Sequence, residues 1–86
     1  MKVIKTVVNL SEDHTIIELS QILAQFESVV IIKKNEGAFY KEANLRSVLG
    51  LISLRLQNGD NITIEGTGKD EEAAVEAVAR FISGGA

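Results

Sequence analysis

Two kinds of residue spacing alternate along this chain, and their order limits the folds that it can adopt. Residues 3–10 are rich in β-branched side chains, and residues 29–32 form a short apolar run, so both predict strands. Residues 61–65 alternate polar and apolar positions, as a strand with one solvated face does. Residues 38–43 follow Asn35, Glu36 and Gly37, whose turn chemistry predicts a hairpin.

Three helices are predicted between and after these strands. Thr15 and Glu18 have the spacing of a capping box, so the first helix is expected to begin at about Thr15. The second is expected from Arg46 or Ser47 to about residue 56, although Gly50 weakens it by about 1 kcal/mol relative to alanine. The predicted order is therefore strand, helix, strand, strand, helix, strand, helix.

The ends of the last two helices also carry local signals. Gly59 is expected to close the second helix in a left-handed conformation, and Asp70 to cap the third. Apolar residues at helical spacing are predicted to be buried against one face of the sheet. These residues are Leu19, Ile22, Phe26, Leu51, Ala77, Val78 and Phe81. Four antiparallel strands with three helices on one face make an α+β open-faced sandwich.

Length and composition exclude several classes of protein. The 86 residues suit one domain spanning residues 1–86, and with no cysteine there is no disulfide framework or thiolate metal site. A net charge of −3 argues against nucleic-acid binding, and no apolar run reaches the ~18 residues of a membrane span. We therefore expect a cytoplasmic protein without cofactor or metal. Lys33 and Lys34 are interpreted as ordinary hairpin charges.

The most informative motif is Asn44-Leu45-Arg46-Ser47-Val48-Leu49-Gly50-Leu51-Ile52-Ser53-Leu54. It places Ser47 at the start of a short apolar helix, where a serine can cap the helix. This segment, with residues 59–64 and 66–73, resembles the HPr family of small phosphocarriers in the bacterial sugar phosphotransferase system. The element order resembles that family along essentially the whole chain.

The resemblance implies a regulatory role for Ser47, because the equivalent serine of the family is phosphorylated by a dedicated kinase. It implies protein partners: an HPr kinase, a transcription regulator or phosphotransferase-system components. Arg46, beside Ser47, supplies positive charge for a phosphate. Val48, Leu51 and Ile52 are predicted to flank Ser47 as a partner surface, while Leu54 is expected to turn into the core.

The family also carries a phosphorylated histidine, followed by Ala-Arg-Pro, at the start of its first helix. The one histidine here, His14, lies in Ser11-Glu12-Asp13-His14-Thr15, which lacks that arginine and proline. Nearby carboxylates would repel a phosphoryl group. His14 is thus a polar loop residue in one interpretation and the phosphoryl-accepting catalytic residue in the other.

Three functional hypotheses follow. The first is a divergent, Crh-like member of the family that works by protein recognition through Ser47, with its histidine site degenerate. The second is a working phosphocarrier, rather than a turnover enzyme, that uses His14 in sugar uptake. The third is an unrelated α+β binding module, which would leave the resemblance over residues 44–54 unexplained.

Overall fold

The observed elements follow the predicted order. The computed structural model describes residues 1–10, 16–36, 39–54 and 56–84. Its elements are β1 (Lys2–Val7), α1 (Ile16–Leu23), β2 (Val29–Glu36), β3 (Phe39–Asn44), α2 (Val48–Leu54), β4 (Asn61–Thr67) and α3 (Glu71–Ile82). The expected first cap Thr15 and the turn residue Gly37 lie outside the described residues, as does His14.

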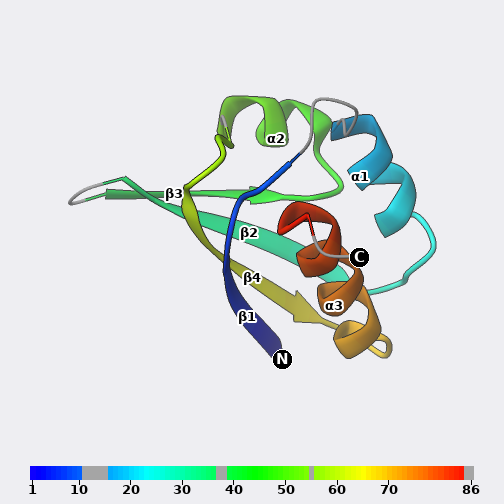
Figure 1. The fold of residues 1–86 in the computed structure, drawn as a ribbon. Helices are drawn as coiled ribbons and strands as arrows, with labels where there is room; N and C mark the ends of the chain where they lie inside the picture. Colours follow the sequence, from blue (N-terminus) through cyan, green and yellow to red (C-terminus); the bar gives the residue numbers. More distant parts are fainter. Residues whose placement is uncertain (11–15, 37–38, 55, 85–86) are drawn as a thin grey trace.

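The four strands form one antiparallel sheet in the order β1-β4-β2-β3. Alternate residues of the two central strands face the helices, and Val30, Ile32, Ile62 and Ile64 are almost fully buried there. The helices cover this one face, as Figure 1 shows, so the predicted open-faced sandwich is confirmed. On the other face, Val3 and Val29 are each 42% exposed. This face is the open side of the sandwich.

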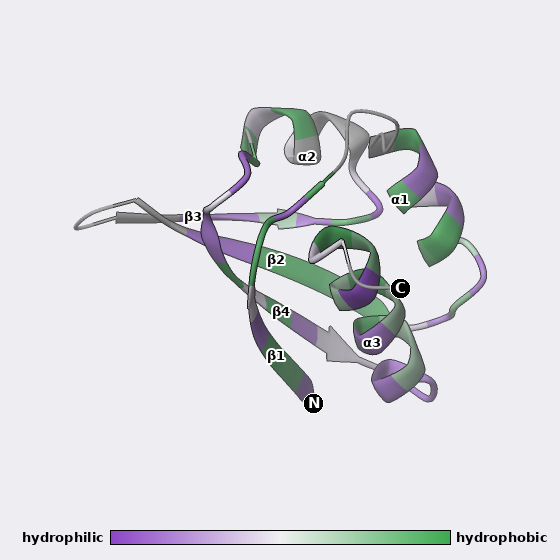
Figure 2. Cartoon of the chain, viewed as in Figure 1, coloured by the Kyte–Doolittle hydropathy of each residue, from purple (hydrophilic) through white to green (hydrophobic). Residues whose placement is uncertain are grey.

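The helices divide the covered face between them. α3 packs on β1, β4 and β2, α2 packs on β3, and α1 contacts both other helices. β2 changes from hydrophobic to hydrophilic toward its hairpin with β3, where it extends past β4 (Figure 2). The buried residues of α3 are Ala74, Val75, Val78, Ala79 and Ile82.

The predicted core is correct in part. Leu19, Val78 and Leu54 are buried, and Phe26 and Phe81 are partly buried against the core. Two more predicted residues, Ile22 and Ala77, are only partly covered, and the side chain of Leu51 lies outside the described set.

Two predicted element ends differ from the observed ones. The first strand stops at Val7 rather than Leu10. Val8 N–H still donates to the carbonyl of Asp60, but the Asp60 N–H donates to Gln57 instead of returning the bond, so the β1–β4 ladder ends here. The second helix stops at Leu54 rather than near residue 56. Gly59 does have positive φ (97°), but it lies in a separate turn, where its N–H donates to Val8.

Lys34 is not an ordinary hairpin charge. It lies on the helix-facing side of β2, 6% exposed, and its Nζ is 3.1 Å from Oδ2 of Asp60. The same ammonium donates to the carbonyl of Leu54 (3.4 Å), the last residue of α2. A buried lysine requires such partners. Lys34 therefore joins the end of α2 to the turn that precedes β4.

Candidate functional site

Ser47 caps α2 and remains open to solvent. The turn before it is closed by Asn44, whose carbonyl accepts from Ser47 N–H and whose Oδ1 accepts from Arg46 N–H, both at 2.9 Å. Oγ of Ser47 then accepts from Gly50 N–H at 3.2 Å, which is the hydrogen bond of an N-cap. The predicted cap is thus confirmed. Because the Ser47 side chain is exposed, its hydroxyl is accessible to another protein.

Gly50 lets α2 lie close to the rest of the site. A Cβ at this position would be 3.3 Å from Oγ of Ser47 and 3.4 Å from Cβ of Ala43 on β3. Both distances are tight, so a side chain here would press on the serine and on the strand together. The glycine therefore allows α2 to pack closely on β3.

The guanidinium of Arg46 is hydrogen bonded to the backbone. Its Nη2 donates to the carbonyl of Phe26 at 2.9 Å and to that of Ser28 at 3.3 Å. These carbonyls belong to the connection between α1 and β2, twenty and eighteen positions earlier in the chain. Arg46 therefore holds this connection against the start of α2, a role that the local sequence did not reveal.

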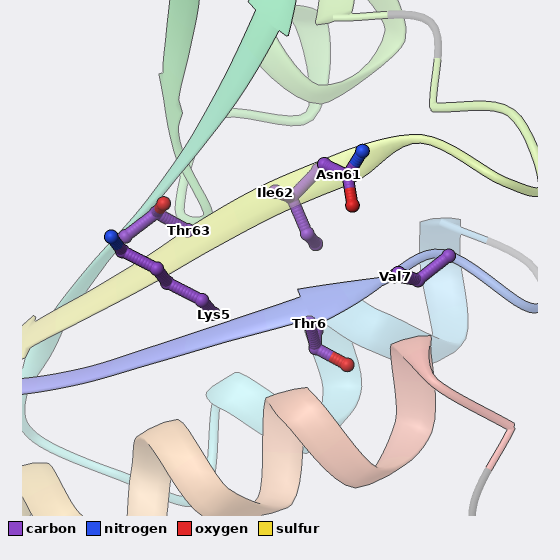
Figure 3. Close-up of a pocket in the computed structure, with 6 residues that line it drawn as sticks. All are labelled: Lys5, Thr6, Val7, Asn61, Ile62 and Thr63. Atoms are coloured by element: carbon purple, nitrogen blue, oxygen red, sulfur yellow. The ribbon is translucent and has the colours of Figure 1, made fainter.

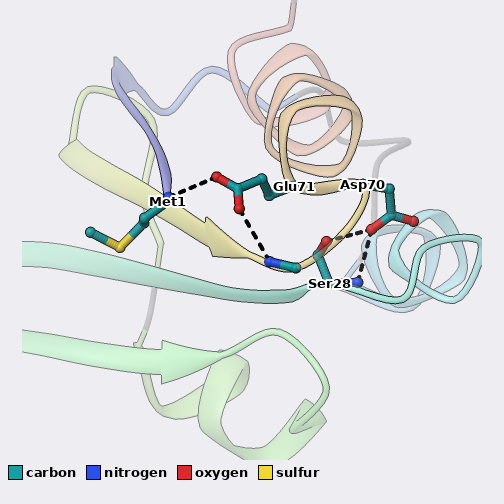
Figure 4. A network of polar contacts seen from close by, with 5 residues as sticks. Met1, Ser28, Asp70 and Glu71 are labelled. Atoms are coloured by element: carbon teal, nitrogen blue, oxygen red, sulfur yellow. Dashed lines mark hydrogen bonds and ion pairs between the residues drawn. The ribbon is translucent and has the colours of Figure 1, made fainter.

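The other side of this connection is held by Asp70. Its carboxylate accepts N–H groups of Glu27 and Ser28, both at 2.9 Å, and a short hydrogen bond from the Ser28 hydroxyl (Figure 4). Asp70 does occupy the N-cap position of α3, but its side chain makes no capping bond, so that part of the prediction is wrong. The Ser28 hydroxyl first, and then the Glu27 N–H, lower the pKa of Asp70.

Next to Asp70, Glu71 closes the start of α3. Its Oε1 accepts from Gly68 N–H at 3.3 Å, and its Oε2 is 2.9 Å from the amino terminus of Met1 (Figure 4). The ammonium group first, and then the Gly68 N–H, lower the pKa of Glu71. These contacts fix the start of α3 to the N-terminal end of β1 and to the turn after β4.

Exposed apolar side chains lie on α1 and α2. Ile52 is 55% exposed, as expected of a partner surface, and Ile17 is 65% exposed. The side chains of Val48 and Leu51 lie outside the described set. Ile17 was not predicted from the sequence as a surface residue. Its position outside the predicted apolar stripe of α1 was the signal that could have indicated it.

A small hollow of about 190 Å³ separates α1 from the turn before α2. Its lining residues are Ser20, Leu23, Ala24, Leu45 and Arg46. The hydroxyl of Ser20 is buried and has no hydrogen-bond partner among the residues that the structure describes.

A second hollow lies on the sheet. The hollow between β1 and β4, about 260 Å³, has Lys5 as its one charged lining residue, and Lys5 extends toward Thr63 (Figure 3). Within the described ranges, no three His, Cys, Asp or Glu side chains gather to hold a metal ion. None of the described helices is long and apolar enough to cross a membrane. His14 is not placed relative to Ser47, because it lies outside those ranges.

Comparison with known proteins finds the family that the sequence resembles. Residues 14–84 match the family described as PTS HPr component phosphorylation site. The HPr-like protein Crh of Halalkalibacterium halodurans is 38% identical over 58 residues, which is 67% of this chain but 64% of that protein. The phosphocarrier protein HPr of Lysinibacillus sphaericus is 36% identical over 67 residues, covering 74% and 72% of the two chains.

Solved structures agree on the fold. HPr from Thermoanaerobacter tengcongensis superimposes with a TM-score of 0.77 at 25% identity, over 95% of this chain and 91% of that one. Crh from Bacillus subtilis gives 0.69 at 27% identity, over 90% and 83%.

Proposed function

This chain belongs to the HPr family of the phosphotransferase system, and from that premise we propose that it is a regulatory protein whose phosphorylated residue is Ser47. The observation that carries the proposal is the exposed hydroxyl of Ser47 at the start of α2. Likeness to two Crh proteins supports a regulatory role, and likeness to phosphocarrier proteins keeps the carrier role as a second candidate.

The proposed reaction is phosphoryl transfer from ATP by an HPr kinase. Oγ of Ser47 attacks the γ-phosphorus, its proton passes to a base of the kinase, and ADP leaves. The hydroxyl suits this step because, among the described residues, its oxygen accepts the Gly50 N–H and its O–H donates to no other group. The phosphate would add about −1.5 to −2 of charge to a chain whose net charge is −3, which is enough to change the choice of partner.

We propose that partners bind the surface around Ser47, formed by Arg46, Ile17 and Ile52, with Val48 and Leu51 as further members. Exposed isoleucines on two adjacent helices give such a surface apolar contact area. The partners that suit it are the kinase and a transcription regulator that distinguishes the phosphorylated from the unmodified chain. This work belongs in the cytoplasm, where ATP is available.

The test is mass spectrometry after incubation with ATP and an HPr kinase. We expect one phosphate, located on Ser47 and absent from Ser47→Ala. Ser53→Ala is the matched control, because Ser53 is also an exposed serine of α2. Phosphate on Ser53, or no phosphate under conditions that label an authentic HPr, would contradict the proposal.

A phosphocarrier role for His14 is the second candidate. It is favoured by the family match, which starts at this residue, the one histidine of the chain. We propose that this transfer is inefficient, since the sequence around His14 lacks the arginine and proline of the family and carries Glu12 and Asp13 instead. Rapid acid-labile labelling by phosphoenolpyruvate and enzyme I, lost in His14→Ala, would reverse this ranking.

A further inference from the structure

The connection between α1 and β2 is held from two sides, and one of the two holding groups is the neighbour of Ser47. Arg46 binds the carbonyls of Phe26 and Ser28, whereas Asp70 binds the N–H groups of Glu27 and Ser28. Ser28 belongs to both sets of contacts. It is 1% exposed, so its backbone has little freedom as long as both groups stay in place.

The two holding groups differ in how easily they can be displaced. Asp70 makes three hydrogen bonds to this connection. Arg46 binds neutral carbonyls through a single nitrogen, and its side chain is exposed. A guanidinium forms stronger, bidentate bonds with a phosphate than with carbonyl oxygens. Arg46 is therefore the contact that a nearby phosphate can break.

A phosphate on Ser47 would be near enough to do so. Consecutive Cα atoms are about 3.8 Å apart, and an arginine side chain is longer than that distance. No burial opposes a swing of the Arg46 side chain back toward α2, since both residues are exposed. The swing would leave the carbonyls of Phe26 and Ser28 to water.

We propose, on the basis of the proposed function, that Arg46 is a charge-operated clasp. Phosphorylation of Ser47 draws its guanidinium away from Phe26 and Ser28 and loosens the connection between α1 and β2. The effect of phosphorylation then extends beyond α2, to the end of α1 and to the contact between Asp70 and Ser28. A partner could in this way sense the phosphate through the shape of the 26–28 segment as well as through its charge.

The test measures amide hydrogen exchange by NMR at Glu27 and Ser28, whose N–H groups are held by Asp70. Phosphoserine is encoded genetically at position 47, so the experiment does not depend on any kinase. We expect exchange at these amides to become about threefold faster or more, as local opening becomes easier. Unmodified Arg46→Met should show the same acceleration, and phosphoserine 47 should add nothing to it.

Phosphoserine encoded at position 53 is the matched control, because it places the same charge on the same helix but seven positions after Arg46 in the chain. Three results would overturn the proposal: no acceleration with phosphoserine 47, equal acceleration with phosphoserine 53, or an effect that persists in Arg46→Met. Each of them can occur whether or not a kinase modifies Ser47, so failure of the clasp is distinguishable from failure of the proposed function.

Discussion

Gly66 offers a direct test of how closely α3 packs on the sheet. It lies on the helix-facing side of β4, and a Cβ there would overlap Cγ2 of Val75, which is fully buried on α3. Its φ is not positive, so alanine is acceptable to the backbone. The cost of Gly66→Ala is therefore one of overpacking, which is about 2–3 kcal/mol for a contact this close. A gain of about 0.5–1 kcal/mol in chain entropy offsets part of it. The net loss of unfolding free energy should be about 2 kcal/mol.

The companion substitution decides whether this reasoning is correct. Val75→Ala removes two buried methyl groups and should cost about 2–3 kcal/mol alone. In the double variant, the new methyl at Gly66 enters the space that Val75 vacates, so the two costs should not add. We expect a favourable coupling energy of about 2 kcal/mol. Urea unfolding followed by far-UV circular dichroism measures it, since the chain has no tryptophan. Simple additivity would refute the close contact between Gly66 and Val75.

Two further predictions concern ionic contacts. Lys34→Met should lower the free energy of unfolding by about 1–2 kcal/mol, because the partly exposed Asp60 loses its ammonium partner and the Leu54 carbonyl loses a donor. Amide hydrogen exchange should accelerate more within α2 than within α3. Uniform acceleration would argue against a local role. Asp70 has a pKa lowered below 3.8, so its stabilising contribution is present above that pH and is lost as the pH falls through the folded value. Ser28→Ala should weaken this acid dependence, and an unchanged acid-unfolding midpoint would contradict the assignment.

The fold was predictable because each element carries its own local signal. Burial of one side of an element sets the pattern of its apolar residues. It gives the alternation in residues 61–65 and the three- to four-residue spacing around Leu19 and Val78. Those signals do not depend on distant neighbours. The element order then left few arrangements open.

The details that were missed depend on distant partners. Asp70 has the residue type and position of a cap, yet it binds Ser28, 42 positions away. Lys34 sits beside Lys33 in the sequence but is buried because Asp60 and Leu54 lie across from it. Arg46 is separated from Phe26 by 20 positions. No pattern within a single element reports such contacts.

We propose that this protein is phosphorylated on Ser47 rather than on His14. The most direct measurement compares both routes on one sample: initial labelling rates with ATP and an HPr kinase, and with phosphoenolpyruvate and enzyme I, each read by intact mass. An authentic HPr serves as the standard for both. We expect labelling close to that of the standard in the first reaction, lost in Ser47→Ala, and little labelling in the second. Fast labelling by phosphoenolpyruvate that disappears in His14→Ala, with none from ATP, would contradict it.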